Sequence, residues 1–312
     1  MLIINSPYNL ISKKLINAVS DFKIDFPGAF SIRENGLCIG HQSSKNIIIE
    51  PKTDRPGINV TVLPGTKGET VYIPTTVTEG GMNDHVYNDF YIGKDCDIKI
   101  VSGCGVHTDD GNDAKHSGVH HLVIDENAHV LYEEKHMGMG DGVGVHSINP
   151  VTDAELKANA YLEINATQIG GIDAAYRKSH IILGENARLI IRERLYTEKE
   201  QKTETHFKVE LNGDGSSADV VSRSVARDQS YQRMDSLIIG NSVCTGHTEC
   251  DSIIDEEAVV DASPRLIAKN KEASLIHEAA IGRIAGEQIQ KLRTLGLSEE
   301  QAENEIIQGF LE

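Results

Sequence analysis

The chain has 312 residues, of which 39% are hydrophobic, so it can bury a substantial core in one large domain or two smaller ones. Its 30 basic and 47 acidic side chains give a formal net charge of −17, and aromatic residues make up only 5% of the chain. Nucleic-acid-binding proteins usually carry a basic surface with stacking aromatic residues, so we expect no nucleic-acid partner. No apolar run approaches the roughly 20 residues of a membrane-spanning helix, so we expect no membrane partner either.

Residues 1–7 carry neither a charged segment nor a small-residue cleavage site, so we expect no export signal and predict a cytoplasmic protein. The five cysteines form an odd number, which argues against a disulfide framework in that compartment. Each cysteine is then either a small buried apolar residue or a group available for metal or sulfur chemistry.

A helical segment is predicted at the N-terminus, over residues 1–26, and a mainly β core over residues 27–276. The apolar residues that indicate a short amphipathic helix within 5–20 are Leu10, Ile11, Leu15, Ile16 and Val19. In the core, short apolar runs such as those at 47–49 and 60–62 are separated by Gly, Asn and Asp. This alternation is typical of many short strands joined by tight turns.

A six-residue motif recurs within the predicted β core. It consists of two apolar residues, Gly or Asp, two mostly polar residues and a small residue; its copies begin at Tyr91, Val123, Ile182 and Ile253, with a degenerate copy at Ile238. Each copy predicts the end of one strand, a turn with a small residue packed inside the corner, and the start of the next strand. Repeated corners predict a solenoid in which each turn covers the apolar face of the last. A β-sandwich with regular hairpins is the alternative architecture.

The last turn of a solenoid exposes a strand edge, which must be capped or paired with another chain. The N-terminal helix and a helical C-terminal domain, predicted over residues 277–312, are natural caps, and a dimer interface is the other solution. Apolar residues at helical spacing from Ala279 to Leu292 predict a first helix that ends at Gly296. Residues 298–301 form a capping box that begins a second helix, whose apolar side carries Ala302, Ile306, Ile307 and Phe310. These helices either pack on the β core or bind another protein.

Seven histidines lie close together in the sequence, near Cys104; they are His107, His116, His120, His121, His129, His136 and His146. Histidine binds metals, so this group allows a β-helix metalloenzyme as one interpretation. The spacing fits no compact ligand pattern, and adjacent histidines on a strand point to opposite faces. We therefore interpret most of them as ladder or surface residues. The acidic loop at 109–113 lacks the calcium-binding pattern and is predicted to be a solvated turn.

Three potential iron ligands occur late in the chain: the Cys250 thiol, the His277 imidazole and the Glu278 carboxylate. No phosphate-binding loop, nucleophile elbow or convincing pair of catalytic carboxylates is present. We therefore expect no ATP site within this chain, no catalytic residues and no enzyme activity of its own.

The segments around these ligands closely resemble the SufB/SufD family, whose members are scaffolds that build iron–sulfur clusters. The resemblance is carried by Gly246–Ile254 (GHTECDSII), Leu275–Ile284 (LIHEAAIGRI), 287–289, 295–302 (LGLSEEQA) and 309–310. It is strongest over residues 230–311 and weaker, mostly as repeated turns, over residues 85–230.

The resemblance implies a mainly β fold, a right-handed parallel β-helix with a C-terminal helical domain that binds an ABC-type ATPase of the SufC kind. It implies dimerisation through the β-helix and matches the family's cluster ligands to Cys250, His277 and Glu278. The apolar positions expected to contact the ATPase are Ile281, Ile284, Ile289, Leu292, Leu297, Ile306 and Phe310.

We therefore predict a scaffold that forms a transient iron–sulfur cluster at a homodimer interface, with half of the ligands from each chain. An adaptor subunit with the same fold and ATPase contact, but without a cluster, is the alternative. The family's longer member has a sulfur-receiving cysteine inside the β-helix, and the matching strand here has His180 instead. Sulfur would then enter as sulfide, or through Cys244 or Cys104.

Overall fold

The computed structural model describes residues 10–140 and 144–312. The described chain has one helix before the strands, α1 (Leu10–Ser20), and two after them, α2 (Gly286–Thr294) and α3 (Glu299–Leu311). The predicted N-terminal helix is confirmed over the residues of α1, and residues 5–9 of that prediction lie outside the described part. None of the described helices combines the length and the apolar character needed to cross a membrane.

All of the described strands belong to two large sheets, here named sheet A and sheet B. Sheet A contains β1 (Ala29–Glu34), β2 (Leu37–Gln42), β5 (Lys67–Tyr72), β6 (Thr75–Val77), β8 (Asp97–His107), β10 (His129–Met139), β13 (Tyr161–Ile169), β15 (Arg188–Thr197), β17 (Ser217–Ala226), β19 (Thr245–Ile254) and β21 (Ser274–Gly282). Sheet B contains β3 (Ile47–Pro51), β4 (Gly57–Val62), β7 (Asn83–Ile92), β9 (Ala114–Ile124), β11 (His146–Ile148), β12 (Val151–Leu156), β14 (Ala174–Leu183), β16 (Lys202–Leu211), β18 (Tyr231–Gly240) and β20 (Val259–Ala268).

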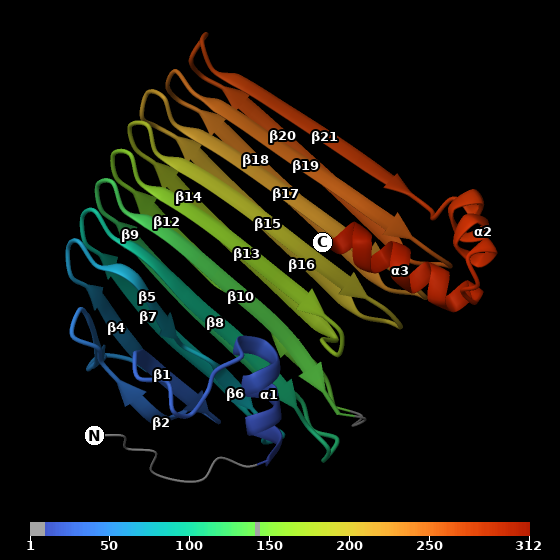
Figure 1. Ribbon diagram of the computed structural model, residues 1–312, viewed down its shortest axis with the longest axis horizontal. Coiled ribbons are helices and arrows are strands. Elements are labelled where there is room, and N and C mark those ends of the chain that lie inside the picture. The colour runs from blue at the N-terminus through green and yellow to red at the C-terminus, as the bar shows by residue number, and fades with distance from the viewer. Residues whose placement is uncertain (1–9, 141–143) are drawn as a thin grey trace.

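From β7 onward the chain alternates between the two sheets, and every described pairing there is parallel. The result is a parallel β-solenoid of about 8 turns, visible in Figure 1 as a stack of strands running from β5 to β21. The predicted β-helix is confirmed and the β-sandwich alternative is wrong, because a sandwich of hairpins requires antiparallel neighbours. Antiparallel pairing joins β1 to β2 and β3 to β4.

The repeated motif marks the corners of the solenoid, as the sequence predicts. Asn127 has a φ of 57°, which turns the chain, and the next residue, Ala128, is 0% exposed inside the corner. Asn186 and Ala187 repeat this arrangement one motif later. A further corner, at Asn159, was missed because its copy begins with a charged residue in place of an apolar one.

Alternate side chains of each strand point between the two sheets and form the core. Over residues 217–224 of β17 and 245–252 of β19, the inward residues are buried and their neighbours are exposed or half-buried. The main apolar cluster extends from the N-terminal hairpins to Cys250 in β19. Burial of this continuous apolar face is the main stabilising contribution to a solenoid.

The two ends of the solenoid differ. At the N-terminal end, the antiparallel strands β2 and β3 form the outer edges of the sheets. At the C-terminal end, β21 is the edge of sheet A and β20 the edge of sheet B, and neither pairs with a further strand among the described residues. Side chains of β21 are exposed or half-buried along its whole length.

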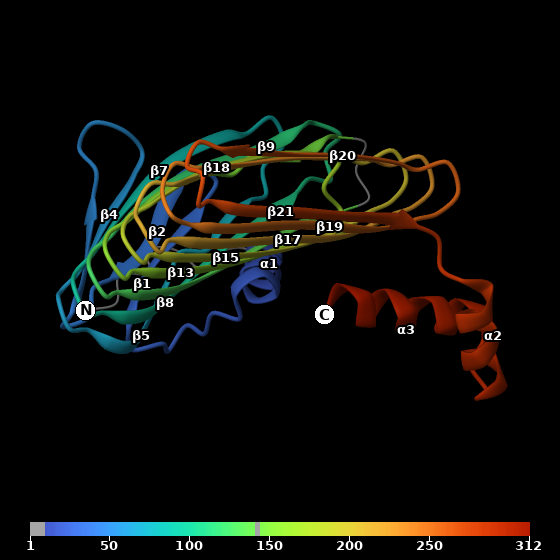
Figure 2. The same cartoon turned by 90° about the horizontal axis from the view of Figure 1, so that it is seen from above.

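The helices lie on the flank of the β-helix and do not cap its ends, in contrast to the prediction (Figure 2). α1 packs on β8 and β10, where Gly103 allows a close approach: a Cβ there would lie 2.4 Å from the Val19 carbonyl oxygen. α3 packs on β17 through Ile307, Leu311 and Val225. Both helices therefore cover the outer face of sheet A and leave β20 and β21 open.

The first C-terminal helix begins later than predicted. Ala279 and Ala280 were placed at its start but belong to β21, which pairs with β19 and continues to Gly282, past the boundary predicted at residue 277. The high helix propensity of alanine is outweighed by the backbone ladder of the sheet. The capping box of the second helix is confirmed, since the Ser298 hydroxyl accepts from the Gln301 N–H and the Gln301 side chain accepts from the Ser298 N–H.

Candidate cluster site at the open end

Cys250 lies in β19, one strand below the open edge of sheet A. Its side chain points into the solenoid and is 3% exposed, between Ser222 of β17 and Ala279 of β21 in the ladder. Burial raises the pKa of the Cys250 thiol to about 11, although a hydrogen bond with Ser252 opposes this rise. At neutral pH the group is therefore a protonated thiol, which must lose its proton before it binds a metal.

His277 and Glu278 both lie in the edge strand β21, where they are exposed. His277 pairs with Thr248, whose side chain points inward, so His277 faces the same way as Cys250. Glu278 pairs with Glu249 and faces outward. The structure therefore brings two of the three predicted ligands, Cys250 and His277, to one face of neighbouring strands and places Glu278 on the other face.

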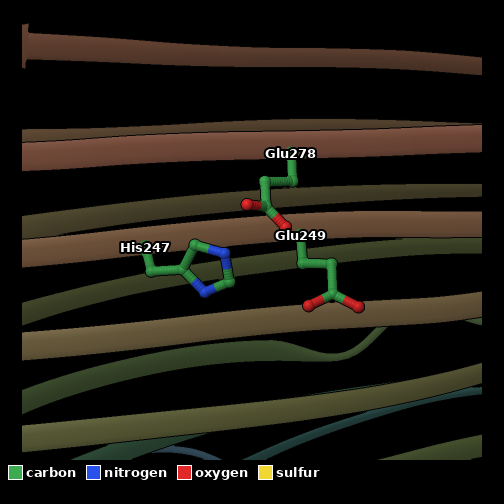
Figure 3. Close-up of side chains that lie close together, drawn as sticks. All are labelled: His247, Glu249 and Glu278. Carbon is green, nitrogen blue, oxygen red and sulfur yellow. The ribbon is translucent and has the colours of Figure 1, made fainter.

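A second group of ligating side chains surrounds Glu278 on the outer face of sheet A. Ligand atoms of His247, Glu249 and Glu278 all lie within 4.8 Å of one another, and Figure 3 shows the three side chains converging from β19 and β21. Burial raises the pKa of Glu249, and a hydrogen bond with Asp251 adds to the rise. His247 and Glu249 were not predicted as site residues, although their separation by two positions on a strand is a signal that they share a face.

The proposed sulfur-route cysteines are buried at two different places. Cys244 is 3% exposed at the corner before β19, and Cys104 is 5% exposed in β8. Burial raises the pKa of the Cys104 thiol well above its ordinary value, and the charge of Glu134 adds to this. β8 and β19 are five strands apart in sheet A, which corresponds to roughly 24 Å at the usual strand spacing.

Between these cysteines, the interior of the β-helix carries a buried ion network. Arg177 of β14 contacts Glu134 and lies 3.5 Å from Glu193, and all three side chains are at most 6% exposed. Glu193 also accepts hydrogen bonds from Thr205 (2.9 Å) and Ser222 (2.8 Å). Burial alone would raise the pKa of Glu134, but Arg177 and His136 hold it well below its usual range. Burial raises the pKa of Glu193.

The comparison of His180 with an inner cysteine is wrong, because His180 points away from the interior. Its side chain is 31% exposed and lies 2.9 Å from Glu210 on the outer face of sheet B. The inward residue beside it in β14 is Ser179, which is 3% exposed.

The histidine-rich group does not form a metal centre among the residues that the structure describes. His107, His116, His120, His136 and His146 are buried in strands that pair with the neighbouring turns, so these five are ladder residues and not surface residues. Each has its own polar contact: Asp109, Asp84, Tyr132, Glu134 and the Thr108 N–H, respectively. Among the described residues, the side chains whose ligand atoms converge are those of His247, Glu249 and Glu278. None of the seven histidines belongs to this group. The predicted solvated turn at 109–113 is confirmed by its exposure.

The apolar residues predicted to contact an ATPase divide into two sets. Ile284 and Phe310 pack against the body of the protein, and Ile289 lines a cavity of about 100 Å³ beneath α3. Leu292, Leu297 and Ile306 are half-buried, and Ile281 of β21 is 46% exposed. The turn between the two helices also presents Leu295, which is 74% exposed and was not predicted.

Comparisons with known proteins agree with this architecture. Residues 79–310 match the SufBD core domain of the SUF system for FeS cluster assembly. An iron-sulfur cluster assembly SufBD family protein of Methanothermobacter thermautotrophicus (strain Delta H) is 30% identical over 220 residues, which cover 69% of this chain and 52% of the relative. A SufBD family protein of Methanocaldococcus jannaschii is 27% identical over 283 residues, 86% of each chain. One from Pyrococcus horikoshii is 31% identical over 223 residues, 70% of this chain and 66% of the relative.

The chain spans about half the length of the Methanothermobacter relatives that it matches, whereas the Methanocaldococcus relative aligns over most of its length. The family match covers the strands from β7 onward together with α2 and most of α3. The chain therefore belongs to the SufBD family, whose members are involved in iron–sulfur cluster assembly.

Proposed function

We propose that this protein is a scaffold on which a transient iron–sulfur cluster is assembled between two copies of the chain. The observation that carries the proposal is the position of Cys250, one strand inside an open edge that presents His277 on the same face. Elsewhere in sheet A, comparable inward positions are covered by further strands. We assign no catalytic step to the chain and place its function in the cytoplasm, where thiols stay reduced.

A second copy of the chain completes the ligand set. One chain offers one thiol and one imidazole on the inner face, whereas clusters are typically held by four ligands, mostly thiolates. A two-fold axis beside β21 would duplicate Cys250 and His277 and would also cover the unpaired strand edges. Mixed ligation by sulfur and nitrogen suits a scaffold, because it favours transfer of the finished cluster to an acceptor.

An ABC-type ATPase bound to α2 and α3 could change the position of these helices relative to the strands at the open end when it hydrolyses ATP. α3 rests on the outer face of β17 at Val225, and the Arg223 side chain reaches the Phe310 carbonyl oxygen at 3.5 Å. On the inner face of the same strand, Ser222 lies next to Cys250. Displacement of α3 would therefore move β17 and expose the Cys250 thiol, which favours its ionisation. Sulfur would reach it as sulfide or through Cys244 or Cys104.

The test is anaerobic reconstitution with ferrous iron and sulfide, followed by absorption spectroscopy and size measurement. We expect a sulfide-bridged cluster in a dimer, and its loss in Cys250→Ala. Cys96→Ala is the matched control, since Cys96 is also a buried free thiol but lies at the corner between β7 and β8, in the N-terminal half of the solenoid. Equal cluster content in Cys250→Ala and wild type would refute the ligand assignment.

The adaptor function is the second candidate, and the burial of Cys250 favours it. A thiol with a pKa of about 11 is a poor ligand until its surroundings change. An adaptor would bind the ATPase and hold no cluster, even when the ATPase and ATP are present during reconstitution.

Both candidates predict binding of the ATPase to the helical domain. Leu295→Asp places a charge on an apolar side chain that is 74% exposed, and we expect at least a tenfold loss of ATPase affinity. Leu37→Asp is the control, because Leu37 is 70% exposed at the opposite end of the molecule. Equal copurification of the ATPase with both variants would contradict the proposed docking surface.

A further inference from the structure

The outer face of sheet A carries a set of three ligating side chains, of which only Glu278 is among the predicted cluster ligands. His247 and Glu249 lie two positions apart on β19, so both point outward, and Glu278 is the ladder neighbour of Glu249 on β21. The ligand atoms of the three side chains lie within 4.8 Å of one another (Figure 3). Small side-chain rotations would bring all three to roughly 2.1 Å from one ion.

The imidazole of His247 is already oriented for this purpose. Its Nδ1 lies 2.8 Å from Oδ1 of Asp219, the ladder neighbour on β17. A carboxylate at Nδ1 fixes the proton on that nitrogen and leaves the Nε2 lone pair free to bind a metal. This carboxylate–histidine arrangement is the usual support of a metal-bound imidazole.

The two glutamates also lack the basic partners that other outward carboxylates have. Glu210 lies 2.6 Å from Lys208, and Glu133 lies 2.7 Å from Lys99. No Lys or Arg forms a salt bridge with Glu249 or Glu278 in the part of the chain that the structure describes. The charges of Arg223 and His247 favour the ionised form of Glu249, whereas Asp251 adds a further negative charge.

We infer that His247 Nε2, Glu249 and Glu278 form a binding site for one divalent transition-metal ion on the outer face of the open end. One imidazole with two carboxylates is a ligand set that Fe²⁺, Mn²⁺ and Co²⁺ accept. The identification of the natural ion as Fe²⁺ rests on the proposed function, whereas the existence of the site does not.

The site lies next to the cluster thiol but on the other side of the sheet. Glu249 and Cys250 are consecutive residues of β19 that point to opposite faces. A ferrous ion held outside would therefore be separated from Cys250 by the thickness of one strand layer, at the edge where β21 is open. The outer site would thus supply iron to the cluster without occupying the thiol beforehand.

Anaerobic titration with Co²⁺ and with Fe²⁺ tests the site in the full-length protein, without sulfide. We expect one ion per chain, bound with the d–d absorption of a nitrogen and oxygen ligand set and without a thiolate-to-metal charge-transfer band. His247→Ala and Glu249→Gln should each weaken binding at least tenfold, and Asp219→Asn by roughly tenfold through loss of the imidazole support.

His180→Ala and Glu210→Gln are matched controls, because that pair has similar exposure on sheet B but lies beside Lys208. Cys250→Ala should bind the ion as wild type does. Undiminished binding in His247→Ala and Glu249→Gln, or a charge-transfer band that disappears in Cys250→Ala, would overturn the inference. Cluster loss in Cys250→Ala combined with unchanged ion binding in His247→Ala would leave the scaffold function intact and reject the outer site alone. Ion binding without cluster formation would support the outer site and reject the scaffold function.

Discussion

The two ends of the β-helix contain similar apolar residues, but these residues are buried at the N-terminal end and exposed at the C-terminal end. At the N-terminal end, Ala29 of β1 and Ile47 of the edge strand β3 are 0% exposed, because both side chains belong to the main apolar cluster. At the C-terminal end, Ile281 of β21 lies opposite the inward residue Ser252 and is still 46% exposed. Composition alone therefore does not decide burial in a solenoid, because each strand is covered by the next one. An exposed apolar edge of this kind is a surface for another chain.

The two ends also differ in the burial of their ionisable side chains. The N-terminal half of the solenoid buries ionisable groups that need partners within the fold, such as Asp84 of β7 and Glu134 of β10. The open end keeps its ionisable groups at the surface, where they are available to bind ligands. Substitutions of similar chemistry at the two ends should therefore differ in their effect on stability.

The largest expected effect is that of Asp84→Asn. The Asp84 side chain is 2% exposed and contacts Arg33 at 2.7 Å and His116 at 3.1 Å, and these partners hold its pKa below the usual range although burial opposes them. Loss of the carboxylate leaves Arg33 without its counter-ion and should lower the free energy of unfolding by about 4 kcal/mol. Urea denaturation at neutral pH measures this change.

The control for this substitution is Asp261→Asn at the open end. Asp261 lies 4.0 Å from Arg233, and both side chains are more than 40% exposed. Exposed ion pairs contribute little, so the expected change is below about 1 kcal/mol. Equal destabilisation by Asp84→Asn and Asp261→Asn would contradict the contrast between the two ends.

The second effect is a loss of stability in mild acid, caused by buried histidine. Burial lowers the pKa of His120 to about 4, although the charge of Glu134 opposes this. Between about pH 6.5 and pH 4 the unfolded chain therefore binds a proton that the folded chain does not, so stability falls as the pH falls through this window. A difference of this size corresponds to about 3 kcal/mol in the free energy of unfolding.

Urea denaturation across this pH range should give a clearly smaller loss for His120→Gln than for wild type. His136, whose pKa burial also lowers, should account for part of the remaining loss. His129→Gln is the control, since His129 is exposed on the outer face of β10. An unchanged pH profile in His120→Gln would mean that another group causes the acid sensitivity.

Sequence reasoning predicted the repeating architecture because each corner of the solenoid is a local signal. A small residue follows a turn residue with positive φ at Asn127 and again at Asn186, and neither depends on distant contacts. The strand that ends the stack was harder to predict, since Ala279 and Ala280 favour a helix and are held in β21 by pairing with β19.

The strand also determines which faces the site residues lie on. Adjacent residues of a strand face opposite sides, and this rule separates His277 from Glu278 as it separates His120 from His121. His277 and Glu278 were named together through the family resemblance, and that they face opposite sides could not be shown without the register of β21. The outer group was missed for a related reason: the convergence of Glu249 with Glu278 depends on the register between β19 and β21, which no local pattern specifies.

The smallest expected effect on stability, and the most direct test of the open end, is that of His277→Ala. His277 is exposed on a strand that the backbone ladder to β19 holds in place, so the change in the free energy of unfolding should be within about 0.5 kcal/mol. The same substitution should remove most of the reconstituted cluster, because it deletes the ligand that shares a face with Cys250. A loss of stability comparable to that of Asp84→Asn would mean that the end is packed in solution and not open. Full cluster content in a stable His277→Ala would mean that the ligands beyond Cys250 come from elsewhere, and the outward group of Glu249 and Glu278 would then be the first place to examine.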